Sequence, residues 1–168
     1  IVGERRPLPE LRLVLDALIE AAGLDQSTMN IVATSNSGES MNAIRAGSVD
    51  AIVMPFSPRA GMIEEAMRNG EMRPLYVSDE VRDAMLEQLP PAFYGVNAEA
   101  GMFTNQSGEI PLVSLNSYMI ARPEVDDDAI YQVAKAILEN TDAFATYHAT
   151  GRLWTVENLL GSPAVPYH

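Results

Sequence analysis

Apolar and polar positions along the first half of the chain alternate between two periodicities. Apolar residues recur every three or four positions where helices are expected, and they form short continuous runs where strands are expected. The predicted helices cover residues 8–22, 37–46, 60–69 and 78–89, and the predicted strands cover residues 1–3, 30–34, 49–54 and 73–77. Alternating strands and helices predict an α/β sheet.

Residues 30–61 are the centre of this pattern. A strand at 30–34, a short helix and a strand at 49–54 predict a right-handed parallel crossover. In open α/β sheets, ligands bind beyond the carboxyl ends of the strands. The polar loops 35–38 and 55–61 each follow one of these strands. We therefore expect both loops to lie on one sheet edge and to form a small-ligand site.

The first loop offers Ser35, Ser37 and Gly38 at the start of a helix. Their hydroxyl and backbone N–H groups suit a ligand carboxylate at a helix N-terminus. The same residues also suit an ordinary N-cap and turn. Both interpretations remain open at the level of the sequence.

The second loop contributes Phe56, Ser57 and Arg59 as the other wall of the predicted site. An arginine suits a carboxylate because its guanidinium forms two parallel hydrogen bonds and stays charged. A solvated surface arginine is the alternative, and the position after a strand favours the binding role.

The second half of the chain is different in character. Residues 93–108 are typical of an irregular strand and loop, and residues 110–121 predict one extended strand that contains Asn116 and Tyr118 as candidate ligand contacts. Helices are expected from residue 127 onward, followed by 140–149 and a short element around Trp154. The first of these helices is expected to face inward with five apolar side chains, which are Ile130, Val133, Ala134, Ile137 and Leu138. These helices have no strand to cover, so we expect them to pack on another surface.

Composition narrows the function classes. The 168 residues have a formal net charge of −12, which disfavours a nucleic-acid partner, because such proteins normally present a basic face. The chain has no cysteine, and none of its apolar runs approaches the length of a membrane span. No catalytic motif is recognisable, so we expect neither an enzyme nor a cofactor. The acidic run 126–128 is better explained as helix capping than as a metal site.

Six passages, in order along the chain, resemble the solute receptors of TRAP transporters of the TAXI type. They are LDALIEAAGL (15–24), residues 37–54, SDEVRDAMLEQLP (78–90) with the aromatic pair at 93–94, residues 97–125, AIYQVAKAILENTDAF (129–144) and TVENLLGSPAVPYH (155–168). The resemblance covers nearly the whole chain. One departure is at residues 4–9, where the family usually has a Gly/Ser/Thr-rich turn.

The resemblance implies a periplasmic-binding-protein-like (type II) lobe with a mostly parallel sheet flanked by helices, plus C-terminal helices. Residues 1–109 would form the second lobe, 110–121 a crossing strand, and 122–168 the helices that return to a first lobe outside this sequence. It implies an extracytoplasmic, periplasmic receptor that captures a small organic acid or amino acid, such as glutamate or a dicarboxylate, and delivers it to TRAP membrane subunits. The rival interpretations are the effector-binding domain of a transcription regulator with the same fold and an enzyme on the same scaffold.

Overall fold

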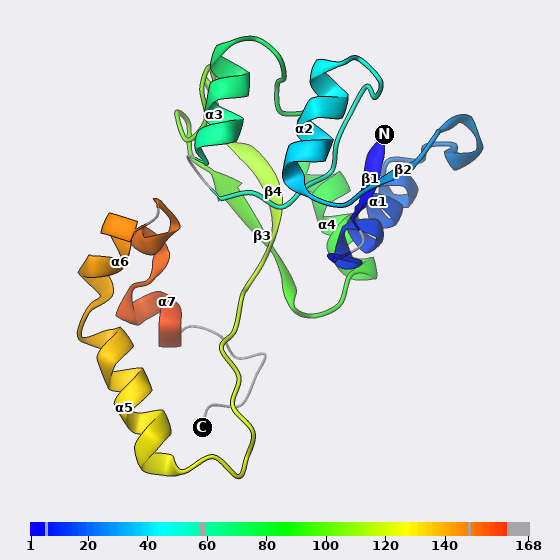
Figure 1. The fold of residues 1–168 in the computed structure, drawn as a ribbon. Helices are drawn as coiled ribbons and strands as arrows, with labels where there is room; N and C mark the ends of the chain where they lie inside the picture. The colour runs from blue at the N-terminus through cyan, green and yellow to red at the C-terminus, as the bar shows by residue number, and fades with distance from the viewer. Residues whose placement is uncertain (6, 58–59, 148, 161–168) are drawn as a thin grey trace. The chain divides into compact units, whose positions relative to one another are not determined.

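The computed structural model of the protein describes residues 1–5, 7–57, 60–147 and 149–160 (Figure 1). The chain divides into two compact units, Ile1–Leu115 and Asn116–His168. Helices alternate with short strands in the first unit, which confirms the predicted α/β class, and the described second unit has helices after an irregular segment at residues 116–126.

The first unit opens with a parallel strand–helix–strand unit. It consists of β1 (Val2–Arg5), α1 (Glu10–Ala21), a 3₁₀ turn (Gln26–Thr28) and β2 (Val32–Thr34). Val2 aligns with Val32 and Arg5 with Thr34 in the two-stranded sheet. The parallel crossover therefore runs through α1, and it does not join residues 30–34 to residues 49–54 as predicted.

Residues 49–54 are a correction to the predicted sheet. The structure describes all of them, and only Ile52 makes an isolated bridge, so no strand forms there. Residues 73–77 likewise form no strand. Both segments contain apolar residues, but they lack the run of partner hydrogen bonds that makes a strand, and Leu75 and Tyr76 are 67% and 57% exposed. Among the described residues the sheets have two strands each, one parallel and one antiparallel, so the predicted mostly parallel sheet is wrong.

The helices of the first unit follow their sequence signals closely. They are α1, α2 (Ser37–Arg45), α3 (Gly61–Arg68) and α4 (Asp79–Gln88). Gly47 and Gly70 follow the ends of α2 and α3 with positive φ angles of 65° and 72°, a conformation that glycine adopts without a steric cost. Ser78 caps α4 by accepting a hydrogen bond from the backbone N–H of Val81 at 3.3 Å.

An antiparallel hairpin completes the first unit. In Figure 1, β3 (Phe93–Ala98) and β4 (Ile110–Leu115) run side by side, with Phe93 opposite Leu115 and Ala98 opposite Ile110. The strand predicted over residues 110–121 therefore ends at Leu115. The pairing explains this end, because β3 supplies partners for β4 only as far as Phe93.

Two apolar clusters hold these elements together. One joins α2, α3 and the hairpin, and its fully buried members include Met41, Ala66 and Ile110. The other places Ala17 of α1 against Met85 and Leu89 at the α4 end, with hairpin residues packed against them. The clusters fix α3 and the N-terminus of α2 on a common framework, which positions the candidate sites described below.

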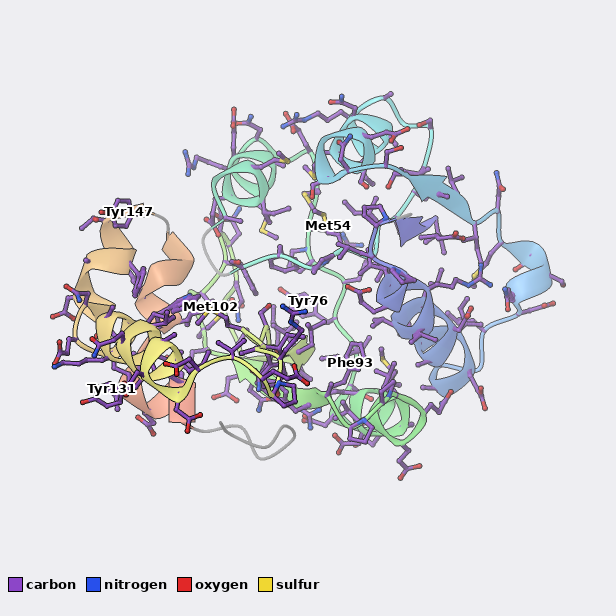
Figure 2. All side chains as sticks on the ribbon, turned by 60° about the horizontal axis from the view of Figure 1, so that its bottom comes forward. Met54, Tyr76, Phe93, Met102, Tyr131 and Tyr147 are labelled. Atoms are coloured by element: carbon purple, nitrogen blue, oxygen red, sulfur yellow. The ribbon has the colours of Figure 1, made fainter. Side chains whose placement is uncertain are left out.

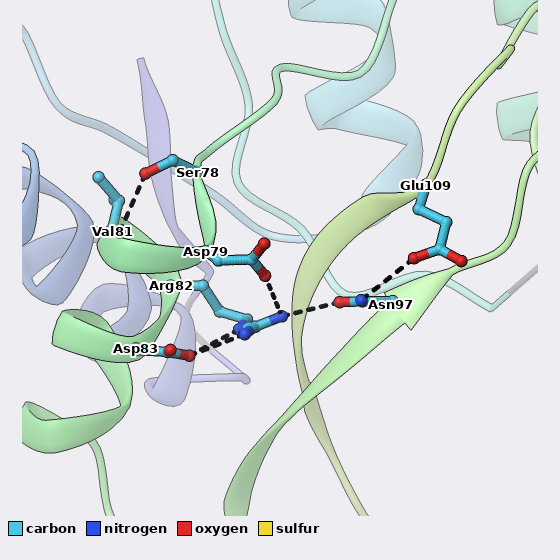
Figure 3. A network of polar contacts seen from close by, with 7 residues as sticks. All are labelled: Ser78, Asp79, Val81, Arg82, Asp83, Asn97 and Glu109. Atoms are coloured by element: carbon cyan, nitrogen blue, oxygen red, sulfur yellow. Dashed lines mark hydrogen bonds and ion pairs between the residues drawn. The ribbon is translucent and has the colours of Figure 1, made fainter.

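A network of polar contacts links α4 to the hairpin (Figure 3). Arg82 is paired with Asp79 at 2.9 Å and Asp83 at 2.8 Å, and it donates to the Asn97 side chain at 2.8 Å. Asn97 in turn donates to Glu109 at 3.3 Å. The Arg82 side chain is only 14% exposed, whereas Asp79 and Asp83 are 62% and 63% exposed, so these bonds tie the helix to the edge of β3 at the surface of the unit.

The second unit consists of short helices with apolar surface outside. They are α5 (Asp127–Leu138), α6 (Thr141–Tyr147), a 3₁₀ turn (Ala149–Leu153) and α7 (Val156–Leu160). Asp126 caps α5 as the acidic run predicted. Val133 and Ala134, predicted to face inward, are exposed, and α5 has no buried residue. Figure 2 labels Tyr131 on α5 and Tyr147 on α6, which are 60% and 83% exposed.

Candidate functional site

The N-terminus of α2 is built by a capping arrangement. The Asn36 side chain accepts a hydrogen bond from the backbone N–H of Glu39 at 2.9 Å. The Glu39 carboxylate reaches back and accepts from the backbone N–H of Ser35 at 2.6 Å. This is a variant of the capping box, in which two backbone donors at a helix start are satisfied by side chains. The positive end of the helix dipole is thus already next to one negative charge from the chain.

A buried pair of hydroxyls anchors this turn to the strand before it. Thr34 at the end of β2 and Ser40 in α2 are 4% and 1% exposed. Their side-chain oxygens are hydrogen-bonded at 2.8 Å, and Ser40 also donates to the Asn36 carbonyl at 3.2 Å. These contacts hold the loop between β2 and α2 in one conformation.

The loop before α3 carries an exposed aromatic ring. Phe56 is 39% exposed, and its ring meets the Phe103 ring edge-on, with centroids 5.4 Å apart and the planes at 61°. Such an arrangement is favourable for two aromatic rings. The Ser57 carbonyl accepts from the backbone N–H of Ala60 at 3.0 Å, immediately before α3 begins.

A groove lies between α3 and the residues that follow β3. It has a volume of about 760 Å³ and is lined by α3 side chains, including Glu64 and Arg68, and by residues 101–104. Small-molecule sites have volumes of this order. The sequence analysis did not anticipate this groove, because Glu64 and Thr104, which meet there, are 40 positions apart in the chain.

An ion pair lies at the C-terminal end of α2. Arg45 at the end of α2 donates to Glu71 at 2.7 Å, and this contact crosses from one helix end to the loop after α3. The hydrogen bond from Arg45 lowers the pKa of Glu71, and the same bond raises the pKa of Arg45. Each side chain thus stabilises the charged form of the other.

The comparison with family models covers almost the entire chain. Residues 11–168 match the model of the NMT1-like family. The chain belongs to the NMT1-like family. Among curated proteins, none matches the sequence significantly. The family is related to solute-binding proteins and has a periplasmic-binding-like fold, so membership indicates a ligand-binding function with a small molecule as partner.

Within this NMT1-like chain, three of the predicted ligand contacts come together. Ser35 lies just before the cap of α2, and Ser37 and Gly38 are the first two residues of the helix. The sequence analysis missed Asn36 and Glu39, although an Asn followed three positions later by Glu is a helix-start pattern. A ligand carboxylate at this helix start would have to share the site with the Glu39 carboxylate.

The other predicted contacts are dispersed. Phe56 packs on Phe103, and Ser57 precedes α3. Arg59 lies outside the described residues. Asn116 and Tyr118 are exposed residues at the start of the second unit, beyond the end of β4. The predicted common sheet edge does not exist in the described structure, because residues 49–54 form no strand.

The described residues contain neither a metal-binding cluster nor a helix suited to span a membrane. No group of three or more His, Asp or Glu side chains there is placed to hold a metal ion. No helix in the described part is both long and apolar enough to cross a membrane.

Proposed function

We propose that this NMT1-like chain is the ligand-binding component of a TRAP-type transport system of the TAXI family. It captures a small organic acid or amino acid outside the cytoplasm, in the periplasm, and delivers it to the membrane subunits of the transporter. The observation that carries this proposal is the match of residues 11–168 to a family related to solute-binding proteins. The six passages that resemble TAXI receptors support the narrower assignment.

The ligand carboxylate would bind at the start of α2. Backbone N–H groups and the helix dipole favour an anion at this place, and Ser35 and Ser37 add hydroxyl donors. Arg59 would supply the second, bidentate contact, with Phe56 and Ser57 beside it. Asn116 and Tyr118 would contribute from the segment that connects the two lobes of the receptor.

Capture would proceed by closure of two lobes about a hinge, with the ligand buried between them. The exposed apolar side chains of the second unit support a further lobe as their partner. Val133, Leu153 and Val156 are 46%, 51% and 50% exposed, and side chains of this kind are stabilising when they are buried. The chain would do no chemistry on its ligand and would need no cofactor.

A transport experiment tests this proposal. Cells that lack the gene should lose uptake of one carboxylate from a panel of radiolabelled organic acids and amino acids, and the restored gene should recover it. The tagged protein should be released by osmotic shock of the outer membrane. Unchanged uptake of every compound, with the protein retained in the cytoplasm and bound to DNA through a neighbouring domain, would favour the regulator instead.

A further inference from the structure

Glu64, which lines the groove beside α3, has one buried carboxylate oxygen that lacks a hydrogen-bond donor. Glu64 Oε2 accepts from the Thr104 hydroxyl at 2.6 Å, while Glu64 Oε1 is covered by protein atoms and has no partner among the described residues. A buried acceptor without a donor is unfavourable, and nearly all such groups in folded proteins are paired with protein, water or ligand. Glu64 Oε1 therefore marks a place where a donor is missing.

Arg68 provides the complementary charge in the same groove. It lies one helical turn after Glu64, and the two side chains share one face of α3. Residues at this spacing often pair with each other, but Thr104 holds the Glu64 carboxylate instead. No carboxylate of the described residues is within 4.0 Å of the Arg68 guanidinium. Among the described residues, Glu64 Oε1 thus has no donor, and the exposed Arg68 one turn later has no carboxylate partner.

The wall opposite α3 is held in place by a buried glutamine. Gln106 is 6% exposed, and its side chain accepts from the backbone N–H of Phe103 at 2.9 Å. It also donates to the carbonyls of Ala98 at 3.0 Å and Gly108 at 2.7 Å. Both polar atoms of this side chain are therefore hydrogen-bonded, and they tie the loop that carries Thr104 to the backbone at Ala98 and Gly108.

We propose that this groove binds a small zwitterion, with its primary ammonium on Glu64 and its carboxylate on Arg68. The terminal torsion of a glutamate side chain is broad, so a small rotation brings Oε1 toward the groove at little cost. An ammonium then supplies the missing donor. Glu65 also lines the groove, and the two glutamates disfavour a ligand with two carboxylates and no cation.

This site is separate from the start of α2, and it does not depend on the transport function proposed above. Its lining comes from α3, Asn69 and residues 101–104. The proposed carboxylate site shares none of these residues, although its Phe56 contacts the groove residue Phe103. A single metal ion is a poorer occupant, because no group of three acidic or histidine side chains is assembled in the described part of the chain.

Calorimetric titration of the full-length protein tests the groove with matched compounds. The panel pairs glycine with acetate, γ-aminobutyrate with butyrate and 6-aminohexanoate with hexanoate, so that each pair differs by the ammonium. Butylamine and hexylamine retain the ammonium and lack the carboxylate. At least one zwitterion should bind, and its two partial analogues should bind at least about tenfold more weakly, as expected when a charged hydrogen bond is lost.

Variants connect the binding to named side chains. Glu64→Gln and Arg68→Gln should each weaken zwitterion binding at least about tenfold, whereas the matched control Glu87→Gln, on the exposed face of α4, should leave it unchanged. Circular dichroism establishes that each variant is folded. Should Glu64→Gln fail to fold, Thr104→Val tests the same place, because it removes the hydroxyl that donates to the Glu64 carboxylate. Absence of zwitterion binding at millimolar concentrations, equal binding of butyrate and γ-aminobutyrate, or unchanged binding by folded Glu64→Gln would overturn the proposal.

Discussion

The Glu39 carboxylate accepts a hydrogen bond from the backbone N–H of Ser35 at 2.6 Å, one turn back across the start of α2. The chain's own side chain therefore occupies part of the space that an anionic ligand would use. A carboxylate bound at this helix start would meet both the favourable dipole and the negative charge of Glu39. Glu39 should therefore weaken the binding of any anion at Ser35, Ser37 and Gly38.

Glu39→Gln should strengthen the binding of a carboxylate ligand. The amide oxygen of glutamine still accepts from Ser35, but the repulsion between two unit charges, about 1 kcal/mol at 4 Å in water, is removed. Titration of the full-length wild type and variant measures the difference, with Glu87→Gln as the charge-matched control. Weaker or unchanged binding would place the ligand carboxylate elsewhere.

Asn36→Ala should destabilise the protein by about 1 kcal/mol, because it removes the side chain that caps α2. Urea unfolding followed by circular dichroism gives the free energy of unfolding. Ser35→Ala is the matched control, since the Ser35 contact is made by its backbone and survives the substitution. Equal stability of both variants would show that the cap at Asn36 contributes nothing.

Gly3→Ala should destabilise the protein by about 1–3 kcal/mol, the usual cost of overpacking. A Cβ at this buried position of β1 would collide with the Leu15 side chain of α1, which is 1% exposed. The double variant Gly3→Ala/Leu15→Ala should cost less than the sum of the two single variants, because the shortened Leu15 leaves room for the new methyl group. Strict additivity in urea unfolding would contradict this close contact.

Arg82→Met should destabilise the first unit by about 1–2 kcal/mol. Methionine retains much of the apolar stem, so the loss reports the hydrogen bond to Asn97 and the pairs with Asp79 and Asp83 (Figure 3). Asp79→Asn, at a side chain 62% exposed, should stay within about 0.5 kcal/mol of the wild type. Similar stability of Arg82→Met and wild type in thermal unfolding would show that the Arg82 contacts do not stabilise α4 against the hairpin.

The helices could be predicted from sequence because their signals are local. Gly23, Gly47 and Gly70 follow helix ends with positive φ angles, and Ser78 and Asp126 accept hydrogen bonds at helix starts. Each signal acts within a few residues of the boundary that it marks. The same applies to the C-terminal helices, although their apolar faces gave no information on the partner that would cover them.

The strands were harder to predict because a strand requires a partner from elsewhere in the chain. Residues 49–54 and 73–77 contain apolar side chains as β2 does, but in the described structure no strand pairs with either segment in a ladder. Residues 110–121 are uniformly β-prone, yet the pairing with β3 ends at Leu115. Hydrophobic pattern alone does not distinguish a strand from a buried extended segment.

The candidate sites also differ in how far their signals are local in the sequence. The start of α2 was predicted because its small polar residues are adjacent in sequence, although the roles of Asn36 and Glu39 emerged only from the hydrogen bonds. The groove was missed because its contact between Glu64 and Thr104 is not local. Arg59, predicted to bind the ligand carboxylate, lies outside the described residues, so its role stays a prediction.

The central claim is that the protein binds a small carboxylate, and a thermal-shift screen of the full-length protein tests it most directly. A ligand that binds the native state raises the melting temperature by mass action, by an amount that grows with ligand concentration. We predict a concentration-dependent rise with at least one organic acid or amino acid, reduced in Arg59→Ala. An unchanged melting temperature across the whole panel, for a protein with a cooperative unfolding transition, would contradict the claim.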